Sequence, residues 1–285
     1  MFVPTLQPKD ELLHDVVQIL QQASEIIRQE YLTFCQGGKF HVQTKQDDSP
    51  VTQADLKANQ VIETALQKLT PALPLLSEEN EHQERHTWSR CWVLDPLDGT
   101  KEFLHQRPEF TINLSQIENG KTLFSAIAIP AQQLIYIGYL DQHPYKYDAE
   151  QQQWYVYQAP EVQQIEPIQV GLSHRSKQPE YQEFIEILQQ SHVIETSQAG
   201  SAYKFCMMLE GEIDIYPRFH PTSEWDTSSG QALLESIGGG LMTLDGKPFQ
   251  YNQRETVLNG GFIAFRDQYC KKIAYEALAH SGILD

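Results

Sequence analysis

The feature that most constrains this chain is residues 92–100, which read WVLDPLDGT and place two aspartates at the end of an apolar run. The apolar residues 91–94 predict a short buried strand, so Asp95 lies where that strand ends and the chain turns. The proline and the glycine that follow keep this turn tight. We therefore expect Asp95 and Asp98 to point into one cleft.

The same turn also predicts an anion site. If a helical turn follows, the amides of Gly99 and Thr100 lie at its positive end, where they can hold an anion. Two carboxylates beside an anion would repel it, unless divalent cations lie between them. The segment therefore predicts a metal-dependent site that processes phosphate. The alternative is an ordinary surface turn, because Asp-Pro and Asp-Gly pairs are common in loops.

Acidic residues stand at three further element ends. Glu78 and its neighbour Glu79 close the apolar segment 75–79, whereas Asp55 and Asp226 each open a helical pattern. Asp55 lies three residues after a threonine and Asp226 three residues after a serine, which is also the spacing of a capping box. Helix capping and a functional role are both open for these two aspartates. Four acidic element ends in one chain favour a shared site.

Four motifs in this chain resemble, in order and spacing, the signature of the inositol monophosphatase superfamily. They are PVTQAD at 50–55, SEE at 77–79, DPLDGTKEF at 95–103, and WD at 225–226 followed by GG at 238–239. The resemblance extends from about residue 48 to 240. Within it, SHR at 173–175, GSAYKFC at 200–206 and IYPRF at 215–219 resemble the branch of bacterial 3'(2'),5'-bisphosphate nucleotidases of the CysQ type.

The fold class that we expect is α/β, in the form of a layered αβαβα sandwich of the sugar-phosphatase type, as the resemblance implies. An N-terminal α+β half, 1–160, carries most metal ligands, and a C-terminal α/β half, 161–285, carries Asp226 and the nucleotide-binding residues. Apolar residues at helical spacing predict a first helix of about five turns from residue 12. Residues 110–140 predict a β-meander with an Asn119-Gly120 hairpin, and 141–166 a connection between the halves that contains a strand at 154–157. Strands and helices alternate beyond it.

The resemblance implies a magnesium site of two or three Mg²⁺ ions. Hard Mg²⁺ prefers oxygen ligands, and the implied set consists of Glu78, Asp95, the carbonyl of Leu97, Asp98 and Asp226. Asp95 would bridge two ions, with Glu78 and Leu97 completing the first ion and Asp98 and Asp226 the second. The implied catalytic residues are Thr100, which orients the attacking water, Asp55 behind it, and Glu78.

Substrate binding is implied for the residues of the metal end and for a second group. The first set is Glu78, Leu97, Asp98, Gly99, Thr100 and Asp226; the second, which would hold a non-reacting phosphate, is His174, Ser201, Lys204 and Arg218. The ordinary alternatives for the second set are a solvated lysine, a satisfied histidine and a charge at a strand end. Arg175 and Tyr203 are neighbours to which we assign no role.

The leading hypothesis is a Mg²⁺-dependent phosphatase that converts adenosine 3',5'-bisphosphate to AMP and phosphate. The resemblance also implies a place in sulfur metabolism and sensitivity to Li⁺. One alternative is hydrolysis of inositol or sugar phosphates by the same metal site. Another is a ligand sensor on a phosphatase scaffold, which would be expected to lack part of the metal set.

Charge and cysteine usage limit the partners and the compartment. A formal net charge of -17 argues against polymeric DNA or RNA, but leaves room for a small phosphorylated nucleotide. The four cysteines form no CxxC pair, which favours a reducing cytoplasm. No stretch reaches about 20 apolar residues. Peripheral association with the cytoplasmic face of the inner membrane and the oligomeric state both stay open.

Overall fold

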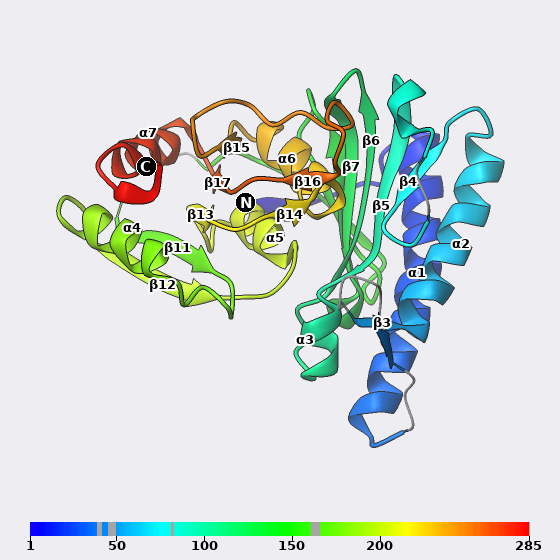
Figure 1. Cartoon of the computed structure of the whole chain (residues 1–285). Coiled ribbons are helices and arrows are strands. Elements are labelled where there is room, and N and C mark those ends of the chain that lie inside the picture. Colours follow the sequence, from blue (N-terminus) through cyan, green and yellow to red (C-terminus); the bar gives the residue numbers. More distant parts are fainter. Residues whose placement is uncertain (39–41, 45–49, 81–82, 161–165, 285) are drawn as a thin grey trace.

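Five layers make up the computed structural model, which describes residues 1–38, 42–44, 50–80, 83–160 and 166–284 (Figure 1). Two long helices cover one face of a large sheet, two helices fill the space between that sheet and a smaller one, and two more cover the outer face of the smaller sheet. In that order they are α1 (Glu11–Cys35) and α2 (Gln53–Leu69), α5 (Tyr203–Glu210) and α6 (Ser228–Glu235), and α4 (Pro179–Gln189) and α7 (Gln268–Ala279). The predicted αβαβα sandwich is confirmed.

The large sheet has eight strands in the order β1-β10-β9-β8-β7-β6-β5-β4. Their bounds are β1 Phe2–Thr5, β4 Leu75–Ser77, β5 Arg90–Asp98, β6 Thr111–Glu118, β7 Lys121–Ile129, β8 Leu134–Tyr139, β9 Tyr145–Asp148 and β10 Gln153–Tyr157. Neighbouring strands are antiparallel except β4 and β5, which run parallel. Because parallel strands end at the same edge of a sheet, the acids that follow β4 and those at the end of β5 come together.

The smaller sheet has five strands in the order β12-β11-β13-β17-β15. They are β11 Ile168–Leu172, β12 Ile194–Gln198, β13 Ile215–Arg218, β15 Gly240–Thr243 and β17 Phe262–Phe265. Two short ribbons stand apart from both sheets: β2 (Val42–Thr44) pairs with β3 (Pro50–Thr52), and β14 (Thr222–Ser223) pairs with β16 (Leu258–Asn259). Short helical turns α3 (Thr100–Leu104) and η3 (Glu224–Asp226) follow β5 and β14.

The middle layer joins the two sheets through one apolar core. This core includes Ile127 of β7, Phe205 of α5, Leu233 of α6 and Phe262 of β17, all of them buried. Burial of large apolar side chains from both sheets holds the sheets against each other, at roughly 1.5–3 kcal/mol for each side chain. Close packing of these side chains therefore sets the distance between the two sheets.

The hairpin between β6 and β7 matches its sequence signal. Asn119 and Gly120 both adopt positive φ, 50° and 84°, as a type I′ turn requires. Within the segment 141–166, the predicted strand at 154–157 is confirmed as β10, whereas β9 was not predicted. Both strands extend the large sheet, and β1 pairs with β10 at its edge. β9 has four residues, all of them half-buried, so it gave little signal in the sequence. The predicted boundary between 160 and 161 borders residues outside the described part.

We predict that Gly120→Ala lowers the free energy of unfolding by about 1 kcal/mol, because an L side chain is disfavoured at a φ of 84°. The added Cβ would also meet the Gln253 side chain at 3.0 Å. Urea unfolding measures the difference. Gly260→Ala is the matched control, since Gly260 has ordinary φ and nothing within 4 Å of an added Cβ. Equal effects of the two substitutions would contradict the prediction.

Candidate active site

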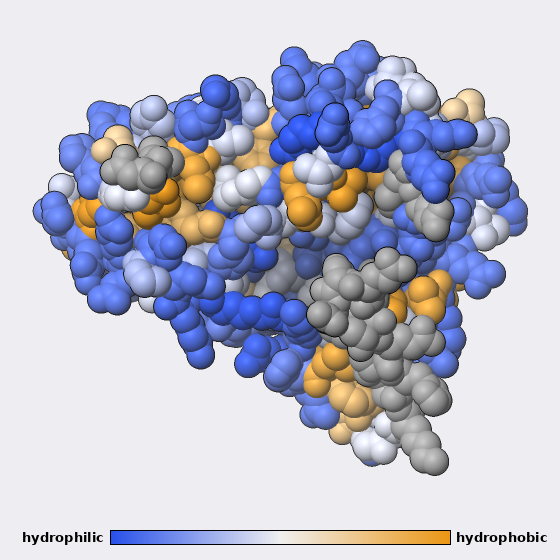
Figure 2. Space-filling view, in the orientation of Figure 1, coloured by the Kyte–Doolittle hydropathy of each residue, from blue (hydrophilic) through white to orange (hydrophobic). Residues whose placement is uncertain are grey.

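A cavity of about 660 Å³ lies between the end of β5 and the segments that follow β11, β12 and β13. Figure 2 shows a largely hydrophilic surface with a recess between the left-hand and right-hand parts of the molecule. Of the predicted site residues, all but Asp55 and Lys204 line the cavity. The predicted residues in its wall are Glu78, Asp95, Leu97, Asp98, Gly99, Thr100, His174, Ser201, Arg218 and Asp226.

Three carboxylates converge at one end of this cavity. Asp95, Asp98 and Asp226 each offer an oxygen that lies within 4.8 Å of the other two. The sequence predicted that the strand ends at Asp95, whereas β5 continues to Asp98 with a shift of register against β6 between these residues. The irregularity is stabilised by the Leu97 N–H, which donates to Asp95 Oδ1 at 2.9 Å. A regular strand would alternate its side chains between faces, so this irregularity helps to bring Asp95 and Asp98 together.

Backbone amides anchor two of these carboxylates by one oxygen each. Asp98 Oδ2 accepts from the Ala202 N–H at 2.6 Å and from Asn113 Nδ2 at 3.2 Å. Asp226 Oδ2 accepts from the Ser223 N–H at 2.8 Å and caps η3. Among the described residues, the second oxygen of each carboxylate accepts no hydrogen bond from the protein. Those oxygens are therefore oriented and available to a cation.

Burial and neighbouring acids raise the pKa values of the three aspartates. Burial raises the pKa of Asp95 well above its ordinary value, and the charges of Glu78, Asp98 and Asp226 raise it further. Burial and the Asp98 charge raise the pKa of Asp226 to about 8. The pKa of Asp98 is also raised, mainly by burial. Like charges this close cannot all stay ionised unless a cation compensates them.

A hard divalent cation fits this donor set. The clustered ligands are carboxylate oxygens, and the described residues bring no thiolate or imidazole into the close group of three. Such a set suits Mg²⁺ and disfavours soft metals. Glu78 follows β4 in the wall of the same cavity, where its N–H donates to the Leu94 carbonyl at 3.0 Å. Its carboxylate is not a member of that close group, although its charge acts on Asp95.

Asp55 does two things at once. One carboxylate oxygen accepts from the Thr52 N–H at 2.9 Å and completes a capping box at the start of α2. The other accepts from the Thr100 hydroxyl at 3.2 Å. Burial raises the pKa of Asp55 to about 6, although the hydrogen bonds from Thr52 oppose this. The two interpretations left open by the sequence, capping and contact with the site, are therefore both present in the geometry.

Cationic and polar side chains line the other part of the cavity. Nε2 of His174 lies 2.6 Å from Glu109 Oε2, which also accepts from the Gly200 N–H at 2.8 Å. Ser201 donates to the Glu109 carbonyl at 2.6 Å. The guanidinium of Arg218 has a buried Nε without a hydrogen-bond partner among the described residues. A buried, unsatisfied donor in a cavity wall is suited to an anionic ligand.

Arg175 and His220 are among the residues of this wall to which sequence reasoning assigned no role. Burial and the positive charges of Arg218 and Arg175 lower the pKa of His220, so these groups lie near one another. Arg175 was visible beside His174 in a motif, but nothing in its pattern indicated that it faces a cavity. His220 lies two residues after Arg218 and carried no signal of its own.

Lys204 lies beneath the cavity and outside its wall. The side chain is fully buried, and Nζ donates to the carbonyls of Ala199 and Ser201 at 2.8 and 3.0 Å. It also lies 4.7 Å from the centre of the Tyr216 ring. Burial is the main cause that lowers its pKa to about 7. In this structure Lys204 supports the loop that carries Ser201, and its predicted contact with substrate stays a prediction.

Comparison with known proteins agrees with this architecture. Two curated relatives named 3'(2'),5'-bisphosphate nucleotidase CysQ are similar over 258 residues, which is 88% of this chain and 98% of theirs: that of Salmonella typhimurium is 38% identical and that of Escherichia coli K12 is 37% identical. The crystal structure of CysQ from Bacteroides thetaiotaomicron matches with a TM-score of 0.75 and 27% identity, covering 91% of this chain and 99% of that one. The model of the inositol monophosphatase family matches residues 9–280. The chain belongs to the inositol monophosphatase family.

Proposed function

We propose that this protein is a metal-dependent 3'(2'),5'-bisphosphate nucleotidase, a phosphoric monoester hydrolase that converts adenosine 3',5'-bisphosphate and water to AMP and phosphate. The observation that carries the proposal is the arrangement of charge along one cavity. Asp95, Asp98 and Asp226 converge at one end, and Arg218 presents an unsatisfied donor elsewhere in the wall. A substrate with two phosphates can place one at each group. The names of the CysQ relatives support the same activity.

The metal end would hold two or three Mg²⁺ ions. We assign their ligands to Glu78, Asp95, the Leu97 carbonyl, Asp98 and Asp226, all of which line the cavity. When bound, such ions lower the pKa of the attacking water and neutralise charge on the phosphoryl and leaving oxygens. The pKa values of Asp95 and Asp226, raised by burial and by neighbouring acids, support this assignment, because a cation would stabilise the ionised carboxylates.

Thr100 and Asp55 are proposed to hold the water for attack. The Thr100 hydroxyl donates either to Asp55 Oδ1 or to the Leu97 carbonyl, both at 3.2 Å. While its proton is directed to Asp55, the threonine oxygen can accept a hydrogen bond from the water and turn a lone pair of that water towards phosphorus. Asp55 itself is fixed by the cap of α2, so the hydroxyl is oriented by a rigid element.

The second phosphate is proposed to bind in the cationic part of the wall. Arg218 offers a planar set of donors that matches phosphate geometry, with His174 and Ser201 nearby in the same wall. His174 is held by Glu109, so its ring orientation is set before a ligand arrives. Inositol monophosphate has no second phosphate for this part of the wall. Arg218 therefore favours the bisphosphate nucleotide over inositol monophosphate.

No helix in the described part of the chain is long and apolar enough to cross a bilayer. A cytoplasmic location, peripheral contact with a membrane and the oligomeric state stay predictions.

A panel of four phosphate esters tests the proposed reaction. With Mg²⁺ we expect adenosine 3',5'-bisphosphate to give a higher kcat/KM than inositol 1-phosphate, because inositol 1-phosphate has no second phosphate for the Arg218 part of the wall. Fructose 1,6-bisphosphate also carries two phosphates, and we expect it to rank below the nucleotide, in keeping with the activity named for the CysQ relatives. The sulfated relative of the nucleotide completes the panel. Release of inorganic phosphate is measured. Faster turnover of inositol 1-phosphate or of the sugar bisphosphate would assign the other activity, and binding without phosphate release would indicate a sensor.

Removing the guanidinium tests the substrate class. Arg218→Gln is expected to raise KM for adenosine 3',5'-bisphosphate by about 10- to 100-fold, because a hydrogen bond to a charged group contributes about 1.5–3 kcal/mol. Turnover of inositol 1-phosphate should change little. Lys247→Gln, which removes one positive charge from an exposed position, controls for net charge. Parallel losses with both substrates would contradict the assigned role.

The thermal stability of the metal-free protein should fall as pH rises from about 4 to about 8. The folded-state pKa values of Asp55, Asp95, Asp98 and Asp226 are raised, that of Asp226 to about 8. The folded protein therefore binds more protons than the unfolded chain in this window, and its free energy of unfolding decreases with pH. Calorimetry measures the change as a fall in Tm, about 2–4 °C for each kcal/mol lost from the free energy of unfolding.

Saturating Mg²⁺ should abolish most of that fall, because the ions compensate the carboxylates that otherwise take up protons. Asp226→Asn should reduce the slope of Tm against pH in the metal-free protein, since it removes one of the four titrating groups. An identical slope with and without Mg²⁺ would show that Asp95, Asp98 and Asp226 do not form a cation site.

A further inference from the structure

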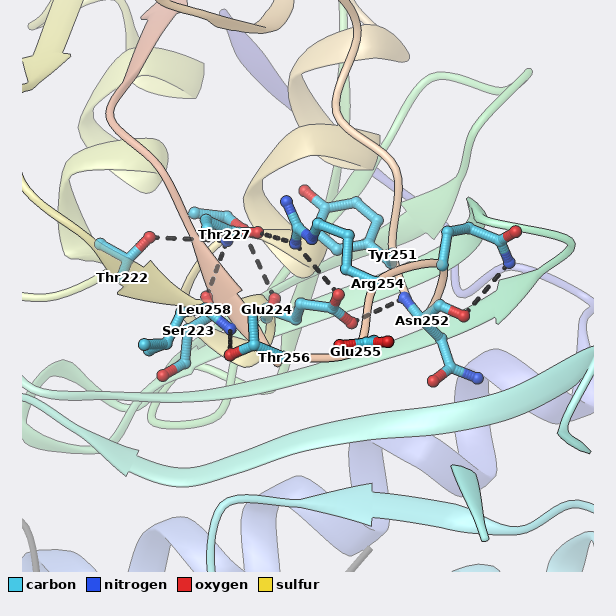
Figure 3. Close-up of polar contacts among 12 residues, drawn as sticks. Thr222, Ser223, Glu224, Thr227, Tyr251, Asn252, Arg254, Glu255, Thr256 and Leu258 are labelled. Carbon is cyan, nitrogen blue, oxygen red and sulfur yellow. Dashed lines mark hydrogen bonds and ion pairs between the residues drawn. The ribbon is translucent and has the colours of Figure 1, made fainter. Parts of the chain in front are cut away.

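Asp226 reaches the metal end on a short turn that begins with a fully buried glutamate. Glu224 stands two residues before Asp226 in η3 and has no exposed surface. It does not line the cavity, so no substrate can touch it. Figure 3 shows its carboxylate among polar groups from the segment 251–259. A buried carboxylate beside a cluster of other acids is costly unless it is fully bonded.

Both oxygens of Glu224 accept hydrogen bonds. Oε2 accepts from the Asn252 N–H at 2.7 Å, and Oε1 accepts from Arg254 Nη2 at 3.0 Å (Figure 3). The Glu224 N–H in turn donates to the Val257 carbonyl at 2.9 Å. Glu224, the first residue of the turn, is therefore held by its backbone N–H and by both oxygens of its carboxylate.

Asn259 holds the same turn from its other side. Its side-chain amide donates to the Ser223 carbonyl at 3.0 Å and to Thr227 Oγ1 at 2.8 Å, while its side-chain oxygen accepts from Arg254. Asn259 therefore holds Ser223, the residue before the turn, and Thr227, the residue after Asp226. Arg254 is common to both sets, since it donates to Glu224 and to Asn259.

Arg85 connects this network to the segment that leads into β5. Arg85 Nη1 donates to Asn252 Oδ1 at 3.0 Å and Nη2 to the Glu255 carbonyl at 2.6 Å, and Asn252 Nδ2 donates to the Trp88 carbonyl at 3.1 Å. Residues 85–88 lie immediately before β5, which carries Asp95 and Asp98. The turn with Asp226 and the strand with the other two acids are therefore tied to one stretch of chain.

We propose that Glu224 is a positioning residue of the metal site, whose buried carboxylate holds the Asp226 turn against the repulsion between Asp226 and the aspartates of β5. The inference rests on the proposed metal-dependent function. Without the anchor, the turn relaxes outward and Asp226 no longer shares a cation with Asp95 and Asp98. Cation affinity then falls, whereas the substrate wall stays in place.

Glu224→Gln is the sharpest variant, because it keeps the volume and changes one acceptor into a donor. A glutamine has a single side-chain oxygen, so its amide group faces either the Asn252 N–H or Arg254, and one of these contacts becomes donor against donor. Glu255→Gln is the matched control. It makes the same chemical change one residue after Arg254, and the Glu255 side chain is exposed. Glu255 takes part in the network through its backbone carbonyl, which the substitution keeps.

Titration with Mn²⁺, followed by the electron paramagnetic resonance signal of the free ion, measures cation affinity without turnover. We expect Glu224→Gln to weaken Mn²⁺ binding by about 10- to 100-fold, the range found when outer partners of metal ligands are removed. Glu255→Gln should match the wild type. In assays with substrate, higher Mg²⁺ should restore kcat of Glu224→Gln, and KM for the nucleotide should stay unchanged.

A purely structural role predicts something different: a lower Tm with an unchanged Mn²⁺ dissociation constant, which would overturn the inference. If Glu224→Gln does not fold, Arg254→Met decides the question in the same titration, because Arg254 is partly exposed and supplies one of the two donors. It is expected to weaken Mn²⁺ binding by about 10- to 100-fold, because it removes the charged hydrogen bond to Glu224. An unchanged constant would again overturn the inference.

The wild-type titration separates this inference from the proposed function. Wild-type protein that binds no Mn²⁺ would overturn the metal-dependent activity and the role of Glu224 together. Tight binding by the wild type and equally tight binding by both variants would overturn only the role of Glu224. Where both single variants fold, the double variant should bind Mn²⁺ no more weakly than the weaker single one, because the two residues act through one contact.

Discussion

Electrostatic repulsion between carboxylates is the constraint on which this structure depends. Asp95, Asp98 and Asp226 lie within a few ångströms of one another; beside burial, Asp98 and Asp226 raise the pKa of Asp95, and Asp98 raises that of Asp226. Ionised neighbours separate unless they are held, so the chain must hold them. It does so with backbone amides, which fix one oxygen of Asp98 and of Asp226, and with an irregularity in a central strand of the large sheet. The apolar core between the sheets fixes the positions of the elements that carry these acids.

Sequence reasoning reached furthest where local pattern and chemistry coincide. The Asn119-Gly120 turn, the acids at strand ends and the sandwich itself follow from signals within a few residues or from a resemblance that covers most of the chain. It failed where burial is decided by distant segments. Lys204 has the sequence of a surface lysine, but packing against Tyr216 and two carbonyls buries it completely. Glu224 and Arg85 lie 139 positions apart, and only the folded chain shows that both bind the segment after Tyr251.

Capping and chemistry turn out to be compatible for the aspartates at helix starts. A carboxylate has two oxygens, and Asp55 uses one for the first turn of α2 and the other for Thr100. Asp226 likewise caps η3 with one oxygen and keeps the other for its neighbours. A capping box therefore gives the side chain a fixed orientation at little cost. Capping and the proposed role in the site are therefore compatible, because each uses a different oxygen of the same side chain.

The acids and the cations of the cavity belong to different parts of the chain. The acids come from β5 and η3, whereas His174 and Arg175 lie on the loop after β11 and Arg218 and His220 on the segment at the end of β13. Neither of these two short stretches anchors a carboxylate of the close group through a hydrogen bond in the described structure. Substitutions in these two stretches can therefore change the anion-binding part of the wall without removing a hydrogen bond that orients the acids, so the ester that is bound and the acids that hold the metal can evolve separately.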